Sequence, residues 1–501
     1  MRCRCRVASG VACAVGMVPL RAFAHGIGER YDLPLPLWLW LSGGGIVIAA
    51  SFVVSSLGMR GASAASPPVS VDASTYIIGR FLTQRWLQRM AQLFSVAAFL
   101  LVVTASFIGD QTPTRNIAPV TIWVIWWIGF AYLSALAGDL WSVVNPWAVI
   151  FAAVEKALQR RGLPIRKRVY PTLMGVWPAV VLFAAFSWLE LVYDSRAVPS
   201  QLGILIVGYS LITWAGMLRY GREVWLAHGD PFAVAFRTLA RFAPTEIRSH
   251  DTVPAPDGVV AAVCNDASAR THKLALRPWG AGLVPTENVS SSMLVFISLL
   301  LSTVTFDGFL ATPTWNAIEG ALFKWATALE GSRLMVINTV GLMFFVSAFL
   351  AIYLLFARWM SRASAGALSA ESAARLFVMS LIPIAIGYHI AHYSSYLLTQ
   401  GQLVIRLASD PFGFGWNLFG TARYRPNYEI VGARFTWYLA VLAIVAGHIF
   451  AVHAAHKIAF REIRDREKAL GSQLPMLVLM IGYTMISLWI IAQPVTEFTQ
   501  N

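Results

Sequence analysis

The chain has 501 residues, of which 57% are hydrophobic and 13% are charged. A water-soluble domain usually carries about 25% charged residues, so the composition excludes an ordinary soluble protein. The formal net charge of +14 does not indicate a nucleic-acid partner, because the basic residues fall between apolar stretches rather than on one polar face. Outside the first 24 residues Cys264 is the single cysteine, which excludes a disulfide framework and a cysteine metal cluster.

Residues 1–24 have the pattern of a signal peptide. Arg2, Arg4 and Arg6 precede an apolar stretch over residues 7–20, and Ala22-Phe23-Ala24 fits the small-x-small rule for signal peptidase. The alternative is an uncleaved first anchor, but the apolar stretch is short for a membrane span and contains two glycines and a proline. The pattern therefore predicts cleavage after Ala24, with His25 as the first residue of the mature protein.

Ten later stretches are apolar and long enough to cross a hydrocarbon core of about 30 Å. They cover residues 37–57, 91–109, 119–137, 173–193, 200–218, 290–308, 334–357, 375–399, 435–456 and 474–492. We therefore expect an all-α integral membrane protein: a polytopic bundle of about ten transmembrane helices that forms one domain over residues 25–501.

The basic residues predict how these helices are oriented. If the mature N-terminus lies outside, the inside loops hold 26 of the 39 lysines and arginines and the outside loops hold nine, with four in the signal segment. This bias follows the positive-inside rule. The predicted topology is N-out and C-out, in the inner (cytoplasmic) membrane, with the bilayer as a partner.

Three connecting segments are long. The inside segments 138–172 and 219–289 contain amphipathic stretches, and in the second of them Phe232, Phe236, Leu239 and Phe242 fall near one helical face. We expect these helices to lie along the membrane surface. Residues 250–269 show no periodicity and are predicted to be a loop. The outside loop 400–432 is rich in turn formers and aromatic residues, which is typical of a lid.

Histidines within the predicted spans are the main candidates for function, because ionisable groups at membrane depth are costly and usually functional. His389 and His392 are three residues apart and hence on one helical face, a spacing that lets two imidazoles bind one metal ion. His448, in the next span, is predicted at a similar depth and is a candidate third ligand. The alternative is a purely structural role, in which these histidines only form hydrogen bonds to neighbouring helices.

Further candidates lie on the predicted outer side. Glu190 and Asp307 are near the outer ends of their spans and are candidate acid/base residues for a bound water. Cleavage after Ala24 would give His25 a free amine beside its imidazole, a pair that favours copper or another late divalent ion. The predicted cofactor is a divalent metal, zinc or copper, with His25, His389, His392 and His448 as ligands.

The sequence resembles the bacterial membrane proteins called fenitrothion hydrolase. The resemblance rests on motifs spread over most of the chain: His25-Gly26-Ile27, Gly138-Asp139-Leu140-Trp141, Trp188-Leu189-Glu190-Leu191, Phe306-Asp307-Gly308, Tyr388-His389-Ile390-Ala391-His392-Tyr393, Asp410-Pro411 and Gly447-His448. It implies hydrolysis of the P–O–aryl bond of lipophilic organophosphorus esters. It supplies no catalytic residues.

Together these patterns predict a metal-dependent hydrolase of lipophilic esters, with its site open to the outer face. Two alternatives stay open. One is a redox protein with haem between His389 and His448, or with copper at His25. The other is a transporter of metal ions or small molecules whose histidines line a path.

Overall fold

The computed structural model describes residues 33–58, 70–249, 272–284, 289–325 and 331–496. Within these ranges, ten helices are long and apolar enough to cross a membrane. They are α1 (Leu37–Gly58), α3 (Arg85–Ile108), the continuous run Ile117–Ala137, Thr172–Leu191 including α8 (Trp177–Leu191), α9 (Pro199–Tyr220), α12 (Ser291–Leu310), α14 (Arg333–Ala363), Ala370–Ser409 including α16 (Ile382–Gln400), α18 (Ala433–Glu462) and α19 (Arg466–Thr496). Each predicted span corresponds to one of them, so the predicted membrane bundle is confirmed. The predicted signal segment and His25 lie outside the described residues.

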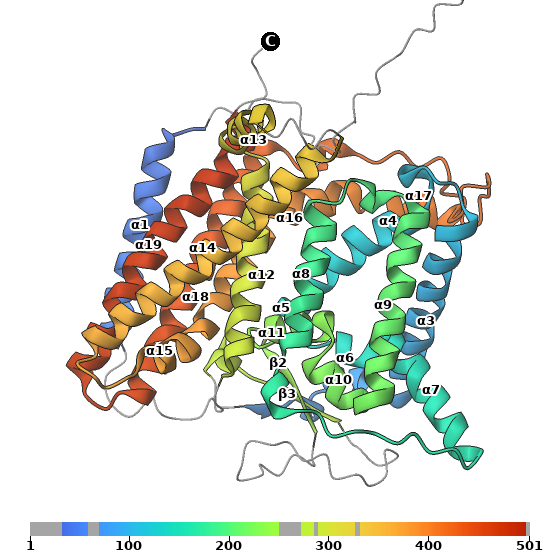
Figure 1. The fold of residues 1–501 in the computed structure, drawn as a ribbon, viewed down its shortest axis with the longest axis horizontal. Helices are drawn as coiled ribbons and strands as arrows, with labels where there is room; N and C mark the ends of the chain where they lie inside the picture. The colour runs from blue at the N-terminus through green and yellow to red at the C-terminus, as the bar shows by residue number, and fades with distance from the viewer. Residues whose placement is uncertain (1–32, 59–69, 250–271, 285–288, 326–330, 497–501) are drawn as a thin grey trace, which may run out of the picture.

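Shorter elements mark the two ends of the bundle (Figure 1). At one end are α13 (Pro313–Trp325), which falls in a segment where the sequence predicted no helix, and α17 (Leu403–Ser409). At the other end are α6 (Trp141–Val144), α7 (Pro146–Arg160), α10 (Arg222–His228) and a small sheet. By the predicted topology the first end is the outer one.

The small sheet was not predicted. It is antiparallel with strand order β1-β3-β2, formed by β1 (Val71–Asp72), β3 (His272–Leu276) and β2 (Thr245–Ser249). β2 and β3 flank residues 250–271, most of which were predicted to be a loop and which lie outside the described residues. The pairing of Val71 with Leu276 joins residues far apart in the sequence, and no local periodicity indicates such a contact.

Helix α11 (Pro231–Ala240) differs from the prediction of a surface-lying helix. Nine of its ten residues are buried, all except Arg237, whereas a helix on the membrane surface would keep one face in water. The Asp230 carboxylate accepts a hydrogen bond from Ala233 N at 2.7 Å and another from the Tyr209 hydroxyl at 2.5 Å, which fixes the start of the helix. Phe232 then packs against Trp126 at 4.5 Å between ring centroids. α11 is therefore a helix inside the bundle.

Helices α16 and α18 meet at two glycines. A Cβ atom on Gly387 would lie 2.4 Å from the carbonyl oxygen of Ala443, and one on Gly447 would lie 2.5 Å from that of Pro383. Only glycine permits this approach, as at other close contacts between membrane helices. The contact fixes which face of α16 looks away from α18.

We expect Gly447→Ala to lower the free energy of unfolding by about 1–3 kcal/mol, because the added methyl group overpacks this contact. Thermal unfolding of the detergent-purified protein measures the change. Gly482→Ala is the matched control, since its Cβ would meet nothing within 4 Å. Equal melting temperatures for the two variants would contradict the close contact.

Candidate functional site

A small cavity lies inside the bundle. Its walls are mostly apolar, and its lining comes from five segments: Trp127, Glu190, Leu191, Leu239, Leu300, Thr303, Val304, Ala385, His389 and Tyr393. Two of these residues, Glu190 and His389, were predicted as site residues. Glu190 is the second-last residue of α8, so the cavity reaches the predicted outer ends of the helices.

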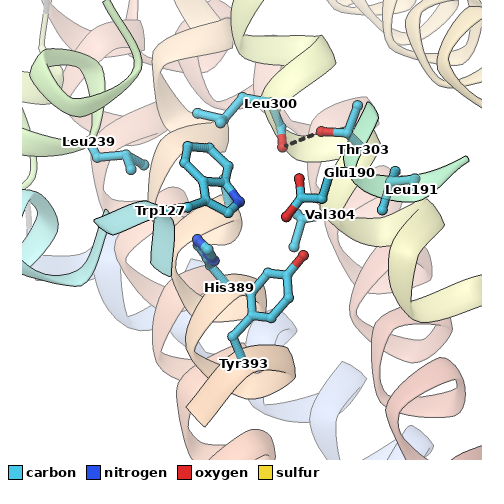
Figure 2. A pocket seen from close by; sticks show the side chains of 10 residues that line it. Trp127, Glu190, Leu191, Leu239, Leu300, Thr303, Val304, His389 and Tyr393 are labelled. Atoms are coloured by element: carbon cyan, nitrogen blue, oxygen red, sulfur yellow. Dashed lines mark hydrogen bonds between the residues drawn. The ribbon is translucent and has the colours of Figure 1, made fainter. Parts of the chain in front are cut away.

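Three polar side chains of this lining face one another. Figure 2 shows the Glu190 carboxylate between the indole nitrogen of Trp127 and the hydroxyl of Tyr393, with the His389 ring beside Tyr393. The ring centroids of His389 and Tyr393 are 4.7 Å apart. A carboxylate, an imidazole and a phenol therefore share one apolar space.

Asp307 joins this group through Tyr393. The Asp307 Oδ2 atom accepts a hydrogen bond from the Tyr393 hydroxyl at 2.5 Å and pairs with His392 Nε2 at 2.9 Å. His392 is buried, with 5% of its side chain exposed, while Asp307 is 25% exposed. Helix α12 thus supplies a carboxylate that holds two neighbouring residues of α16, and Asp307 and His392, which were predicted for different roles, are in direct contact.

The His389 ring is held by aromatic neighbours. Its centroid lies 5.6 Å from that of Tyr132 and 5.9 Å from that of Trp127. The Tyr132 hydroxyl donates to the backbone carbonyl of His389 at 3.0 Å, which fixes this turn of α16. His389 Nδ1 is buried and has no hydrogen-bond partner among the described residues. A buried nitrogen without a partner is costly, so it marks a place for a ligand or a water.

The carboxyl groups of Glu190 and Asp307 interact electrostatically, as do Asp307 and His389. Arg196, in the turn that follows α8, also interacts with Glu190. Glu190, Asp307, His389 and His392 therefore lie near one another, and Arg196 lies near Glu190. Clusters of this kind are concentrated at functional sites.

His448 does not join this group. Its Nδ1 atom is 2.8 Å from the carbonyl oxygen of Ile444, and its ring lies 6.0 Å from that of Tyr483 on α19. The reason is helical geometry: Gly387 faces α18, and His389, two residues later, is rotated about 200° around the helix axis and faces away. The described contacts of His448 are thus with Ile444 and Tyr483, and its role as a metal ligand beside His389 stays a prediction.

The contact between α16 and α18 also concerns the alternative of a haem bound between His389 and His448. The backbones of α16 and α18 touch at Gly387 and Gly447, next to the two histidines. Such a close contact does not favour a porphyrin between the helices at this level, and the redox alternative stays a prediction.

Among the described residues, no group of three or more histidine, cysteine, aspartate or glutamate side chains has the geometry of a metal site. Two features nevertheless fit a metal ligand set. His389 offers an unpartnered Nδ1, and the pairing of His392 with Asp307 is the carboxylate contact that metal-binding histidines usually make. A third ligand from His25 lies outside the described residues.

Sequence reasoning gave no role to Tyr393, Trp127 or Leu239. Tyr393 lies four residues after His389, and this helical spacing was the available signal. Trp127 belongs to the π-helical segment η4 (Val120–Gly129) of the third span, and such segments are frequent at functional sites. Nothing in the sequence indicated Leu239, because α11 was expected at the surface.

Asp110, another acid at the predicted outer side, is apart from the cavity lining. It lies between α3 and the third span, pairs with Arg115 at 3.1 Å and accepts a hydrogen bond from Thr112 N at 2.8 Å. These contacts, chiefly the backbone hydrogen bond from Thr112, lower the pKa of Asp110. It stabilises the loop.

The fold and these residues define a multi-pass membrane protein with a polar cluster in an apolar cavity. Comparison with known proteins adds no relative: no family model matches the chain, and no curated protein or solved structure matches it.

Proposed function

We propose that this protein is a membrane-embedded hydrolase of lipophilic esters, of the organophosphorus P–O–aryl type, whose active site is the cavity beside Glu190, His389 and Tyr393. The observation that carries the proposal is that Glu190, His389 and Tyr393 line one mostly apolar cavity, while Asp307 contacts Tyr393 and His392 beside it. Apolar walls suit a lipophilic substrate that enters from the bilayer. The acids and histidines supply the proton transfers that hydrolysis needs.

In the proposed reaction, water attacks phosphorus and forms a new P–O bond, while the bond to the aryl oxygen breaks. Glu190 accepts one proton of the attacking water. The neutral His389 imidazole, on the same wall, takes this proton from Glu190 at one nitrogen and delivers the proton of its other nitrogen to the departing aryl oxygen, so both groups return to their starting charge. The net result is one ester and one water converted to an acid and a phenol.

Asp307 is proposed as a positioning residue. Its Oδ2 atom holds the Tyr393 hydroxyl and His392 Nε2, and Tyr393 packs directly on His389. Through these two contacts Asp307 sets the orientation of His389, the group that protonates the leaving oxygen. Small displacements of such groups are costly for catalysis.

The metal ion is a separate part of the proposal. A zinc or copper ion bound by His389, His392 and His25 would lower the pKa of its water toward 7 and supply hydroxide for the attack, and Glu190 rather than His389 would then deliver the proton to the departing aryl oxygen. Support comes from the unpartnered His389 Nδ1 and from the carboxylate contact of His392. His448 has no part in this ligand set.

Metal content tests this part directly. We expect the purified wild-type protein to contain zinc or copper, and His389→Ala and His25→Ala each to lose most of it, because each substitution removes a ligand. His448→Ala is the control and is expected to keep the metal. Elemental analysis by mass spectrometry measures all four proteins; a metal-free wild type, or equal loss in His448→Ala, would contradict the ligand set.

The hydrolase proposal itself is tested in proteoliposomes with a lipophilic aryl phosphotriester. We expect release of the phenol at a rate proportional to the amount of protein. Accumulation of intact ester inside the vesicles without release of phenol would favour a transporter. A copper absorption band that changes on reduction, without any hydrolysis, would favour a redox protein.

A further inference from the structure

The outer loop carries a group of exposed aromatic and aliphatic side chains that the proposed reaction does not use. We call residues 410–419 the aromatic loop. The exposed fractions are 52% for Phe414, 43% for Trp416, 59% for Leu418 and 72% for Phe419. Four large apolar side chains exposed within six residues would be unfavourable in water, at about 25 cal/mol per Å² of apolar surface.

The aromatic loop has a defined internal structure. The Asp410 carboxylate accepts hydrogen bonds from Phe414 N at 2.9 Å and from Gly415 N at 2.8 Å. Phe412 and Phe414 stack with centroids 5.4 Å apart, and the edge of Trp416 contacts both rings. The internal hydrogen bonds satisfy backbone groups that would otherwise need water, so the loop can enter a less polar medium.

The position of the aromatic loop identifies that medium. Asp110 N donates to the carbonyl oxygen of Phe412 at 2.7 Å, and Ile117 N donates to that of Pro411 at 3.1 Å. These bonds tie the aromatic loop to the end of α3, whose last residue, Ile108, is 59% exposed. Figure 1 shows the segment between α17 and α18 at the side of the bundle, level with the ends of α3 and α9. The apolar surface of a membrane-spanning helix therefore continues into the loop.

We propose that the aromatic loop is a membrane anchor that inserts into the boundary between the headgroups and the acyl chains of the adjacent leaflet. Aromatic side chains are enriched at this depth of the bilayer. The partner is the phospholipid surface, and a protein partner is disfavoured because the loop continues the lipid-facing surface of α3. This inference does not depend on the hydrolase proposal.

Quenching of a site-specific label tests the anchor. In a full-length chain whose four cysteines are replaced by serine, Phe419→Cys carries a fluorescent label, and the protein is reconstituted in nanodiscs. Phe344→Cys, on α14 and 72% exposed, is the lipid reference. Glu371→Cys, in α15 (Ala370–Phe377) with 70% of its side chain exposed, is the water reference.

We expect nitroxide-labelled phosphatidylcholine to quench the label at position 419, and aqueous iodide to quench it severalfold less than the label at position 371. Leu418→Cys provides a second position if Phe419→Cys does not fold. Iodide quenching equal to that at position 371 would overturn the anchor. Protection from both quenchers would also overturn it and would indicate a protein contact.

Discussion

Glu190→Gln is expected to lower kcat for aryl phosphotriester hydrolysis by about 10³-fold, within the range for loss of a general base. Glutamine keeps the size of the side chain but cannot accept the proton of the attacking water. The measurement is phenol release by protein reconstituted in nanodiscs across a range of pH. The variant is also expected to lose the low-pH limb of the kcat profile, which a purely structural change would leave in place.

Glu155→Gln is the matched control. Glu155 lies on α7 and pairs with Lys167 at 2.8 Å, away from the cavity lining. We expect its rate and pH profile to equal those of the wild type. A Glu190→Gln protein with more than half of the wild-type kcat would remove Glu190 from the mechanism.

Asp307→Asn is expected to lower kcat by about 100-fold, the scale of misplacing a catalytic group by about 1 Å. The neutral amide of asparagine cannot replace the carboxylate oxygen of Asp307 that contacts both Tyr393 and His392. If Asp307 acts by positioning Tyr393, then Tyr393→Phe removes the same interaction from the other side. The double variant is expected to show a coupling energy of about 0.5–3 kcal/mol.

The rate of phenol release is measured for the wild type, the two single variants and the double variant. These four proteins form a double-mutant cycle, which gives the coupling energy. Asp307→Glu, which keeps the charge, is expected to recover part of the lost rate. Strictly additive effects of the two substitutions would mean that Asp307 and Tyr393 act independently, and the positioning role would then be wrong.

The sequence was sufficient for the membrane bundle because each span carries its signal locally. Twenty or so apolar residues bounded by charged or turn-forming residues define a helix such as α12 without knowledge of its neighbours. The boundaries moved by up to eight residues where a helix extends past the predicted span, as α18 does at Glu462 and α19 at Arg466.

The location of helix α11 was harder to predict, because its sequence pattern fits two locations. An aromatic face over a short segment between two spans is typical of a helix on the membrane surface. The same residues also suit a helix buried against Trp126 and Trp127, and packing decides between the two. Asp230 caps the start of α11, and its hydrogen bond from Tyr209 comes from another helix, α9.

Four of the predicted site residues lie near one another in the structure, but their contacts were not predictable from the sequence. His389, His392, Glu190 and Asp307 stood out as ionisable groups near membrane depth, and the structure brings them together. Which histidine meets which acid depends on helix rotation. The sequence does not reveal the contact at Gly387 and Gly447, so it allowed a prediction in which His448 and His389 face each other.

Hydrolysis in water enriched in ¹⁸O tests the central claim most directly. A lipophilic aryl phosphotriester is incubated with the reconstituted wild-type protein, and both products are analysed by mass spectrometry. Attack of water at phosphorus predicts one ¹⁸O atom in the phosphorus-containing acid and none in the phenol, with product formation nearly abolished in Glu190→Gln. Product formation that is unchanged in Glu190→Gln, or no product from the wild type, would contradict the account.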